Sequence, residues 1–66
     1  MTDYPMTPKQ EQELRERARR FYRNKPAASP EVAAVVLSSF VFENGRLGSS
    51  VSFQTRLQIA NEEKSE

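Results

Sequence analysis

The sequence of 66 residues contains no cysteine and no histidine. Without histidine, the side chain that most often exchanges protons near neutral pH is missing, so the usual catalytic triads and Cys–His pairs cannot be built. Without cysteine or histidine, no disulfide, iron–sulfur cluster or ordinary zinc site can form. The only aspartate is Asp3, which also excludes a calcium loop of the EF-hand type. We therefore expect a protein that is not an enzyme and that binds neither a metal nor a cofactor.

The small size of the chain adds an expectation about partners. A domain of this length buries only about 60% of the surface that its unfolded chain exposes. Natural domains of this size commonly gain stability from disulfides, from a metal or from association with another chain. Because the composition removes the first two, the sequence predicts a homodimer.

Long apolar runs are absent as well. No stretch approaches the roughly 20 apolar residues that a membrane-spanning helix requires. The first residues have neither the basic nor the apolar segment of a secretory signal. We expect no membrane contact and a cytoplasmic location.

Charge and hydrophobicity are distributed unevenly along the chain. Residues 1–25 contain seven Lys and Arg against four acidic residues, whereas residues 26–66 contain three against five. Twelve of the 14 Leu, Ile, Val and Phe residues lie between Val32 and Ile59. The first part is therefore expected to form a polar, basic element and the second to supply the core. Flexible ends are predicted on either side of a single domain, which gives three segments: 1–6, 7–60 and 61–66.

The first predicted element is an amphipathic helix over about residues 8–24. Thr7 is a suitable N-cap, Pro8 suits the first helical position, and Gln10 completes a capping box. Apolar residues follow at helical spacing: Leu14, Ala18, Phe21 and Tyr22. Glu–Arg pairs four residues apart are expected to support the helix: Glu11–Arg15, Glu13–Arg17 and Glu16–Arg20.

The second predicted element is a β-hairpin with strands over about residues 33–43 and 46–58, which gives an α+β fold. The first of these segments is rich in β-branched and aromatic side chains. Asn44-Gly45 is the strongest short-range hairpin signal, because a type I′ turn needs positive φ at both central residues.

The register of this hairpin follows from the turn. From Leu47 to Ile59, apolar and polar side chains alternate with the period of a strand. A two-residue turn would pair Phe42 with Leu47 and would place the apolar residues of the second strand on one face. The first strand would be apolar on both faces and would need cover on two sides. The N-terminal helix can cover one side, and a second copy of the chain is the expected cover of the other, which again favours a dimer.

An all-α domain of three helices is the alternative, with helices near residues 8–25, 30–42 and 49–62. Ser29, Pro30 and Glu31 support it, since they resemble another helix start with a capping serine, a first-turn proline and an acidic residue. In that case the third helix gives only a poor match to a helix-turn-helix motif.

Two sets of residues are candidates for function. The basic segment after residue 16 combines positive charge with aromatic residues and could contact phosphates or an acidic surface: Arg17, Arg19, Arg20, Tyr22, Arg23 and Lys25. The same charges could equally form an ordinary solvated helix end, because cations are favoured near a helix C-terminus. The predicted core and dimer contacts are apolar: Val35, Leu37, Phe40, Val41, Phe42, Val51, Phe53 and Leu57.

These features favour a small regulatory or adaptor protein that acts by binding another protein as a homodimer. A regulator that binds nucleic acid through the basic segment is the first alternative. A structural subunit of a larger assembly is the second.

Overall fold

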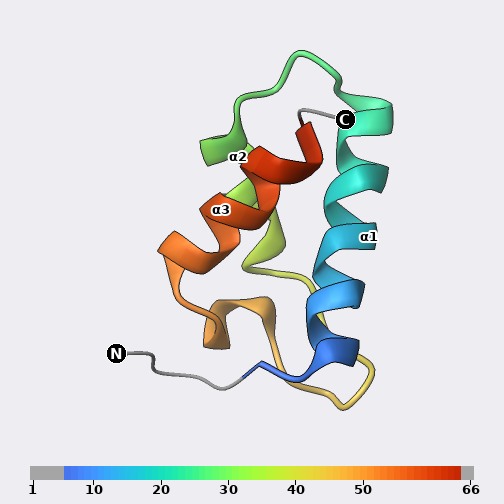
Figure 1. Cartoon of the computed structure of the whole chain (residues 1–66), viewed down its shortest axis with the longest axis vertical. Coiled ribbons are helices and arrows are strands. Elements are labelled where there is room, and N and C mark those ends of the chain that lie inside the picture. The colour runs from blue at the N-terminus through green and yellow to red at the C-terminus, as the bar shows by residue number, and fades with distance from the viewer. Residues whose placement is uncertain (1–5, 65–66) are drawn as a thin grey trace.

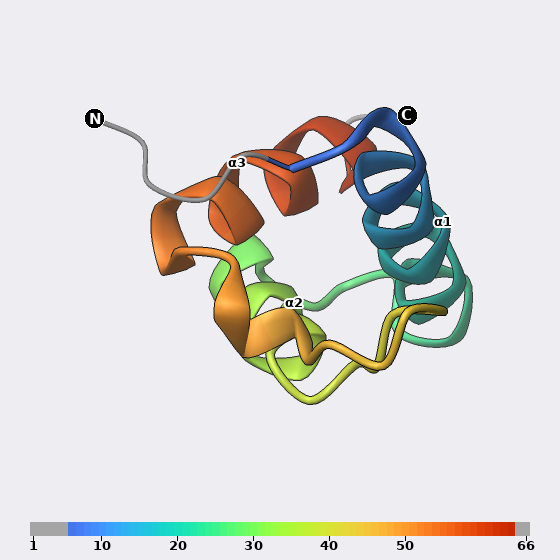
Figure 2. The ribbon, with the colours of Figure 1, turned by 90° about the horizontal axis from the view of Figure 1, so that it is seen from below.

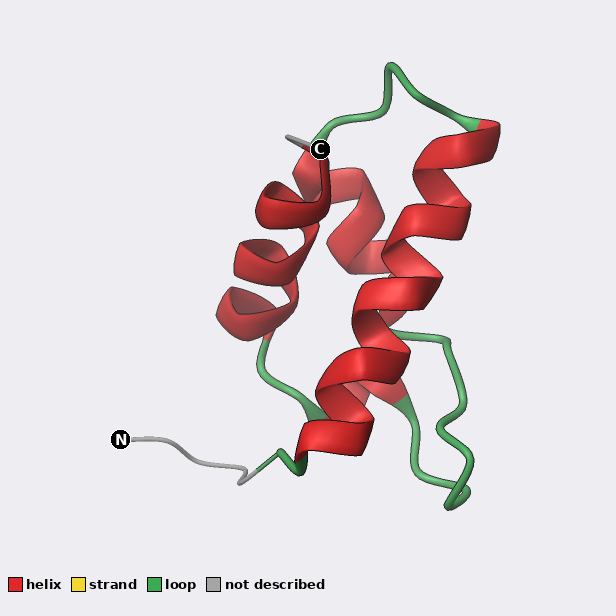
Figure 3. Cartoon of the chain, turned by 45° about the vertical axis from the view of Figure 1, so that its right-hand side comes forward, coloured by secondary structure: helices red, strands yellow, loops and turns green. Residues whose placement is uncertain are grey.

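The computed structural model describes residues 6–64, which form three α-helices: α1 (Pro8–Asn24), α2 (Pro30–Leu37) and α3 (Phe53–Lys64). A short 3-10 helix, η1 (Gly48–Ser50), precedes α3. The three helices surround a common centre, and α3 packs against both of the others (Figures 1 and 2). The described residues contain no strand, so the predicted α+β fold is wrong and the all-helical alternative describes the chain (Figure 3).

Helix α1 begins as its sequence predicts. The Thr7 hydroxyl accepts a hydrogen bond from the Gln10 backbone N–H at 3.1 Å, and Gln10 Oε1 accepts one from the Thr7 N–H at 3.2 Å. This reciprocal pair satisfies two backbone donors that a helix start leaves free. The helix ends before Pro26, after the Lys25 N–H has bonded to the Phe21 carbonyl. The helix expected over residues 8–24 is confirmed.

Helix α2 replaces the first predicted strand. The Ser29 hydroxyl accepts from the Val32 N–H at 3.3 Å, and Pro30 occupies the first turn. Ala33, Ala34 and Leu37 are fully buried, and this three-to-four-residue spacing is that of a helix face. The β-branched valines that indicated a strand lie mainly on the exposed side of this helix. Each costs at most about 0.7 kcal/mol of helix propensity relative to alanine.

The predicted hairpin is reduced to a single antiparallel bridge between Val41 and Leu47. A tight turn does form, since the Gly45 N–H donates to the Phe42 carbonyl at 2.9 Å and the Phe42 N–H donates to Arg46 at 2.7 Å. Of the two central residues, Asn44 and Gly45, only Gly45 has positive φ, at 91°. The turn is therefore not type I′, which needs positive φ at both residues. It gives Leu47 a different partner from the predicted Phe42.

Helix α3 replaces the second predicted strand. The Ser52 hydroxyl accepts from the Thr55 N–H at 3.3 Å, which is the hydrogen bond of an N-cap. The buried positions of the helix follow a spacing of three and four: Arg56, Ile59, Ala60 and Glu63. Two of these residues are charged, so the helical period is hidden when only apolar residues are counted. The alternation from Leu47 to Ile59 does not correspond to one buried face.

The core is filled by all three helices and by residues 38–52, the connection between α2 and α3. Its larger part holds Leu14, Leu37 and Ile59 from the helices together with Phe42 and Val51 from the connection. A second part lies nearer the end of α1 and contains small residues of α2 and α3 around two aromatic rings: Phe21, Tyr22, Ala33 and Ala60. The connection is thus a component of the core and not a surface loop.

The dimensions are those of a compact single chain. The accessible area is 4323 Å², and a folded monomer of 7.6 kDa is expected to expose about 4300 Å². The radius of gyration is 10.8 Å, against about 11 Å expected for this length. Because no strand with two apolar faces exists among residues 6–64, that argument for a dimer no longer holds.

The ends of the chain are described only in part. Residues 1–5 and 65–66, which belong to the segments expected to be flexible, lie outside the described residues. Met6 packs against the core. Residues 61–64 continue α3, and Lys64 Nζ donates to the carbonyls of Pro26 and Ala28 at 3.1 and 2.8 Å. The end of α3 is therefore bonded to the linker between α1 and α2.

Candidate functional site

The six residues of the candidate basic surface have different environments. Arg19 Nε donates to Glu63 Oε1 at 2.7 Å, so its guanidinium joins α1 to α3. Tyr22 is buried between the helices. Its ring meets the Phe21 ring edge to face, with 5.5 Å between the ring centres. The Lys64 ammonium lies 5.1 Å from the centre of the Tyr22 ring. Tyr22 is therefore not placed to stack on a partner, whereas Arg19 is about half exposed and already has Glu63 as an acidic partner.

The buried hydroxyl of Tyr22 has no hydrogen-bond partner among residues 6–64. Burial raises the pKa of this phenol, so it remains protonated and neutral at physiological pH. An unpaired polar group in the interior loses its hydration without compensation.

We expect Tyr22→Phe to raise the free energy of unfolding by about 1 kcal/mol, measured by urea denaturation. A loss of stability would mean that the hydroxyl has a partner in solution, such as a buried water.

Four exposed or half-exposed cations remain, which we call the basic face: Arg17, Arg20, Arg23 and Lys25. Within residues 6–64, none of the four has a carboxylate within 4 Å. The expected pairs Glu13–Arg17 and Glu16–Arg20 do not form, whereas Glu11–Arg15 does, at 2.9 Å. Glu13 instead accepts from the Glu43 backbone N–H at 3.0 Å. Arg17 and Arg20 also border a shallow depression beside Phe40, which Glu13 and Glu16 line as well.

An ion-pair cluster between α1 and α3, the clasp, uses Arg15, Arg19 and Glu63. The Glu63 side chain is only 5% exposed, and it accepts from Arg15 at 3.0 Å and from Arg19 at 2.7 Å. Arg15 also contacts Glu62 at 2.9 Å. The hydrogen bond from Arg15 lowers the pKa of the Glu62 carboxyl, which therefore stays ionised to lower pH than usual. The clasp joins α1 to α3, and Arg19 differs from the four cations of the basic face in having an acidic partner.

Arg56 is a buried residue that the sequence gave no reason to select. Its Nη1 donates to the Ala34 carbonyl at 2.7 Å and its Nε donates to the Val51 carbonyl at 3.0 Å. The Ala34 carbonyl is available because the Ser38 N–H bonds to Val35 in the tightened last turn of α2. Burial lowers the pKa of this guanidinium, although an arginine remains charged. Arg56 thus supplies a hydrogen bond to a free carbonyl at the end of α2 and links this end to the connection.

The eight predicted apolar contact residues separate by exposure. Leu37, Phe42 and Val51 lie inside the monomer and cannot contact a second chain. Phe40 and Leu57 are half-buried. The other three are exposed, as are two further apolar residues, and together they form what we call the apolar face: Val32, Val35, Val41, Leu47 and Phe53.

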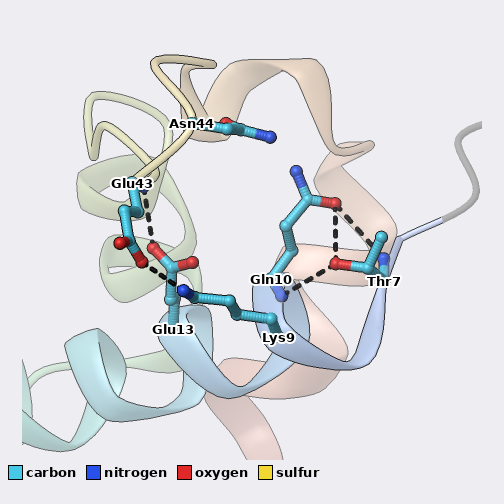
Figure 4. A pocket seen from close by; sticks show the side chains of 6 residues that line it. All are labelled: Thr7, Lys9, Gln10, Glu13, Glu43 and Asn44. Carbon is cyan, nitrogen blue, oxygen red and sulfur yellow. Dashed lines mark hydrogen bonds and ion pairs between the residues drawn. The ribbon is translucent and has the colours of Figure 1, made fainter.

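A polar pocket of about 300 Å³ lies between the first turn of α1 and the turn at residues 43–46 (Figure 4). We call it the amide pocket; its lining residues are Thr7, Lys9, Gln10, Glu13, Glu43 and Asn44. On one side the Lys9 ammonium pairs with Glu43. This contact raises the pKa of Lys9 and lowers that of Glu43, so both groups are charged near neutral pH. The sequence indicated Gln10 as a capping residue and Asn44 as a turn residue, but not that the two meet.

Two further features to consider among the described residues are a metal site and a membrane span. Residues 6–64 hold no group of three acidic side chains placed to bind a metal ion. None of their helices has the length and apolar character needed to cross a membrane. Comparisons with protein-family models, with curated proteins and with solved structures find no match to this chain.

Proposed function

We propose that the chain is a small regulatory or adaptor module that binds another protein through the apolar face. The observation that carries the proposal is the exposure of its five large side chains, which ranges from 43% for Phe53 to 60% for Val35. Single exposed apolar residues are ordinary on a protein surface, but a concentration of them indicates a contact site. Here they come from residues 32–53 and none comes from α1. The absence of histidine and cysteine supports a role without catalysis.

Contacts among their neighbours relate the segments that carry four of these residues. The Arg56 guanidinium lies 5.6 Å from the centre of the Phe53 ring and bonds to Ala34, the residue before Val35. Val41 and Leu47 pair across the antiparallel bridge. The connection that carries them returns to the end of α2, where the Gly48 N–H donates to the Phe40 carbonyl at 2.6 Å. A partner could therefore cover α2, the connection and the start of α3 together.

A second copy of the chain is the partner that we expect first. Stable interfaces bury about 800 Å² on each side, which is roughly a fifth of the 4323 Å² that the monomer exposes. The monomer is already compact, so association would serve recognition more than folding. Light scattering over a range of concentrations should give the molar mass of a dimer for the wild type. The double variant Val35→Gln/Val41→Gln should give the mass of a monomer. A wild-type monomer throughout would exclude self-association, and much larger oligomers would favour a structural subunit.

Capture experiments test the wider proposal against the nucleic-acid alternative. We expect a protein captured by the wild type from nuclease-treated lysate to bind Val35→Gln/Val41→Gln about tenfold more weakly. Arg17→Gln/Arg20→Gln is the matched control and should bind as the wild type does. Titration calorimetry with the purified partner measures the affinity of both variants. The proposal fails if the apolar-face variant binds normally.

Nucleic-acid binding remains the second candidate, supported by the basic face and its lack of acidic partners. A helix-turn-helix mode is disfavoured, since that motif joins its helices by a turn of three or four residues and α2 and α3 are separated by residues 38–52. Contacts from the four cations would give an affinity that falls steeply with salt. A plot of the logarithm of the binding constant against the logarithm of the salt concentration should have a slope of about −0.9 per phosphate contact. Binding that nuclease abolishes, that depends on salt and that Arg17→Gln/Arg20→Gln removes would favour this function.

A further inference from the structure

The amide pocket contains two carboxamide groups, that of the buried Gln10 and that of the exposed Asn44. Gln10 is only 6% exposed although its side chain reaches the pocket. In Figure 4 the amide nitrogens of Gln10 and Asn44 point toward each other from opposite sides, one from α1 and the other from the 43–46 turn. Neither nitrogen has a hydrogen-bond partner among residues 6–64. Each carries two N–H donors, so these two groups present donors that have no acceptor among the described residues.

The orientation of both amides follows from their neighbours. The oxygen and nitrogen of a carboxamide are assigned from the groups that they face. Gln10 Oε1 faces the Thr7 backbone N–H at 3.2 Å, and Asn44 Oδ1 faces the Arg46 backbone N–H at 3.0 Å. A backbone N–H can only donate, so each contacting atom must be the oxygen. The nitrogens are therefore directed away from these contacts and into the pocket.

The charges around the pocket select the kind of acceptor. Its lining contains two carboxylates, Glu13 and Glu43, and one ammonium, Lys9. Lys9 is paired with Glu43, and Glu13 accepts from the Glu43 N–H at 3.0 Å. The local balance is thus negative, which disfavours an anionic ligand. A neutral carbonyl oxygen can accept two hydrogen bonds without this repulsion.

We propose that the amide pocket binds a neutral peptide carbonyl, which accepts hydrogen bonds from Gln10 Nε2 and Asn44 Nδ2. The ligand class is an uncharged segment of polypeptide main chain. This site is separate from the apolar face and does not depend on the function proposed for that face. Two hydrogen bonds fix the position and direction of one peptide group. The pocket therefore gives specificity for a main-chain conformation and not for a side chain.

Two substitutions of nearly identical shape test this proposal. Gln10→Glu keeps an oxygen for the Thr7 N–H, because glutamate is a standard member of the capping box. Asn44→Asp keeps an oxygen for the Arg46 N–H in a turn that favours aspartate as well as asparagine. Each change replaces the donating nitrogen with an oxygen and adds one negative charge. Gln12→Glu, on the exposed side of α1, adds the same charge and serves as the control.

The experiment is an NMR titration of the isotope-labelled full chain with N-acetyl-glycyl-glycine N-methylamide. We expect saturable shifts of the Gln10 and Asn44 side-chain NH₂ signals in the wild type, with the same binding in Gln12→Glu. Gln10→Glu and Asn44→Asp should bind about fivefold more weakly or worse, the factor expected for one neutral hydrogen bond. N-acetyl-glycyl-glycine, which ends in a carboxylate, should also bind more weakly. Binding that is absent in the wild type, unchanged in both variants, or equally strong for the carboxylate would overturn the proposal.

Discussion

Replacing Gly48 with alanine is expected to lower the free energy of unfolding by about 3 kcal/mol. A Cβ at this position would lie 1.9 Å from the Leu37 carbonyl oxygen and 3.0 Å from its carbon. Both are backbone atoms at the end of α2, so no side chain can rotate to make room. The Gly48 N–H is also held by the Phe40 carbonyl at 2.6 Å. The alanine can be accommodated only if the connection moves away from α2, which would disturb the core around Phe42.

Urea denaturation compares this variant with two controls. Gly45→Ala meets no atom within 4 Å but has φ of 91°, so it should cost about 1 kcal/mol through backbone strain alone. Ser49→Ala lies beside Gly48 on the exposed side and should change stability little. If Gly48→Ala were no more destabilising than Gly45→Ala, the close approach of the connection to α2 would be wrong.

Arg56→Met is expected to be comparably destabilising, by about 3 kcal/mol. Methionine can fill much of the buried space, but it cannot donate to the carbonyls of Ala34 and Val51. Hydrogen bonds from a charged donor contribute roughly 1.5–3 kcal/mol each. Removal of a buried charge offsets part of this loss, since its desolvation is no longer required. The two carbonyls stay buried without a donor, so the balance is unfavourable.

Conservative variants separate hydrogen bonding from charge. Arg56→Lys retains the charge but has a single ammonium, which cannot reproduce the fixed fork of the guanidinium. Its stability, measured by thermal or urea unfolding, should therefore lie between those of the wild type and Arg56→Met. Arg23→Met, an exposed substitution of the same type, should have little effect. Equal stability of Arg56→Met and the wild type would contradict the bridging role.

The sequence was informative where local contacts decide the structure. The bounds of α1 follow from Thr7, Gln10 and Pro26, all of which act within one helical turn of their own position. The Ser29-Pro30 start was equally visible, but the valines after it favoured a strand. Burial of Ala33, Ala34 and Leu37 against the other helices outweighed this preference. Strand propensity mostly measures fit to a half-buried surface, and here that surface is supplied by helices.

The candidate sites were less predictable because their residues depend on distant partners. Arg19 pairs with Glu63 of α3, and Glu13 bonds to the Glu43 backbone and not to Arg17. The amide pocket joins α1 to a turn more than thirty residues later in the sequence. No local pattern could indicate that Gln10 and Asn44 face each other. Composition identified the basic segment, whereas only tertiary structure separates its paired from its unpaired cations.

The connection between α2 and α3 has a consequence for the order in which the chain folds. Each helix carries start signals in its own sequence and can form transiently from local contacts. Phe42 and Val51 have no regular structure of their own and are buried only when Leu14 and Ile59 are already in place. Contacts between such separated residues bear the entropy cost of closing the chain. The connection should therefore become ordered last during folding, and the amides of Phe42 and Gly48 should exchange with solvent before those at the centre of α1.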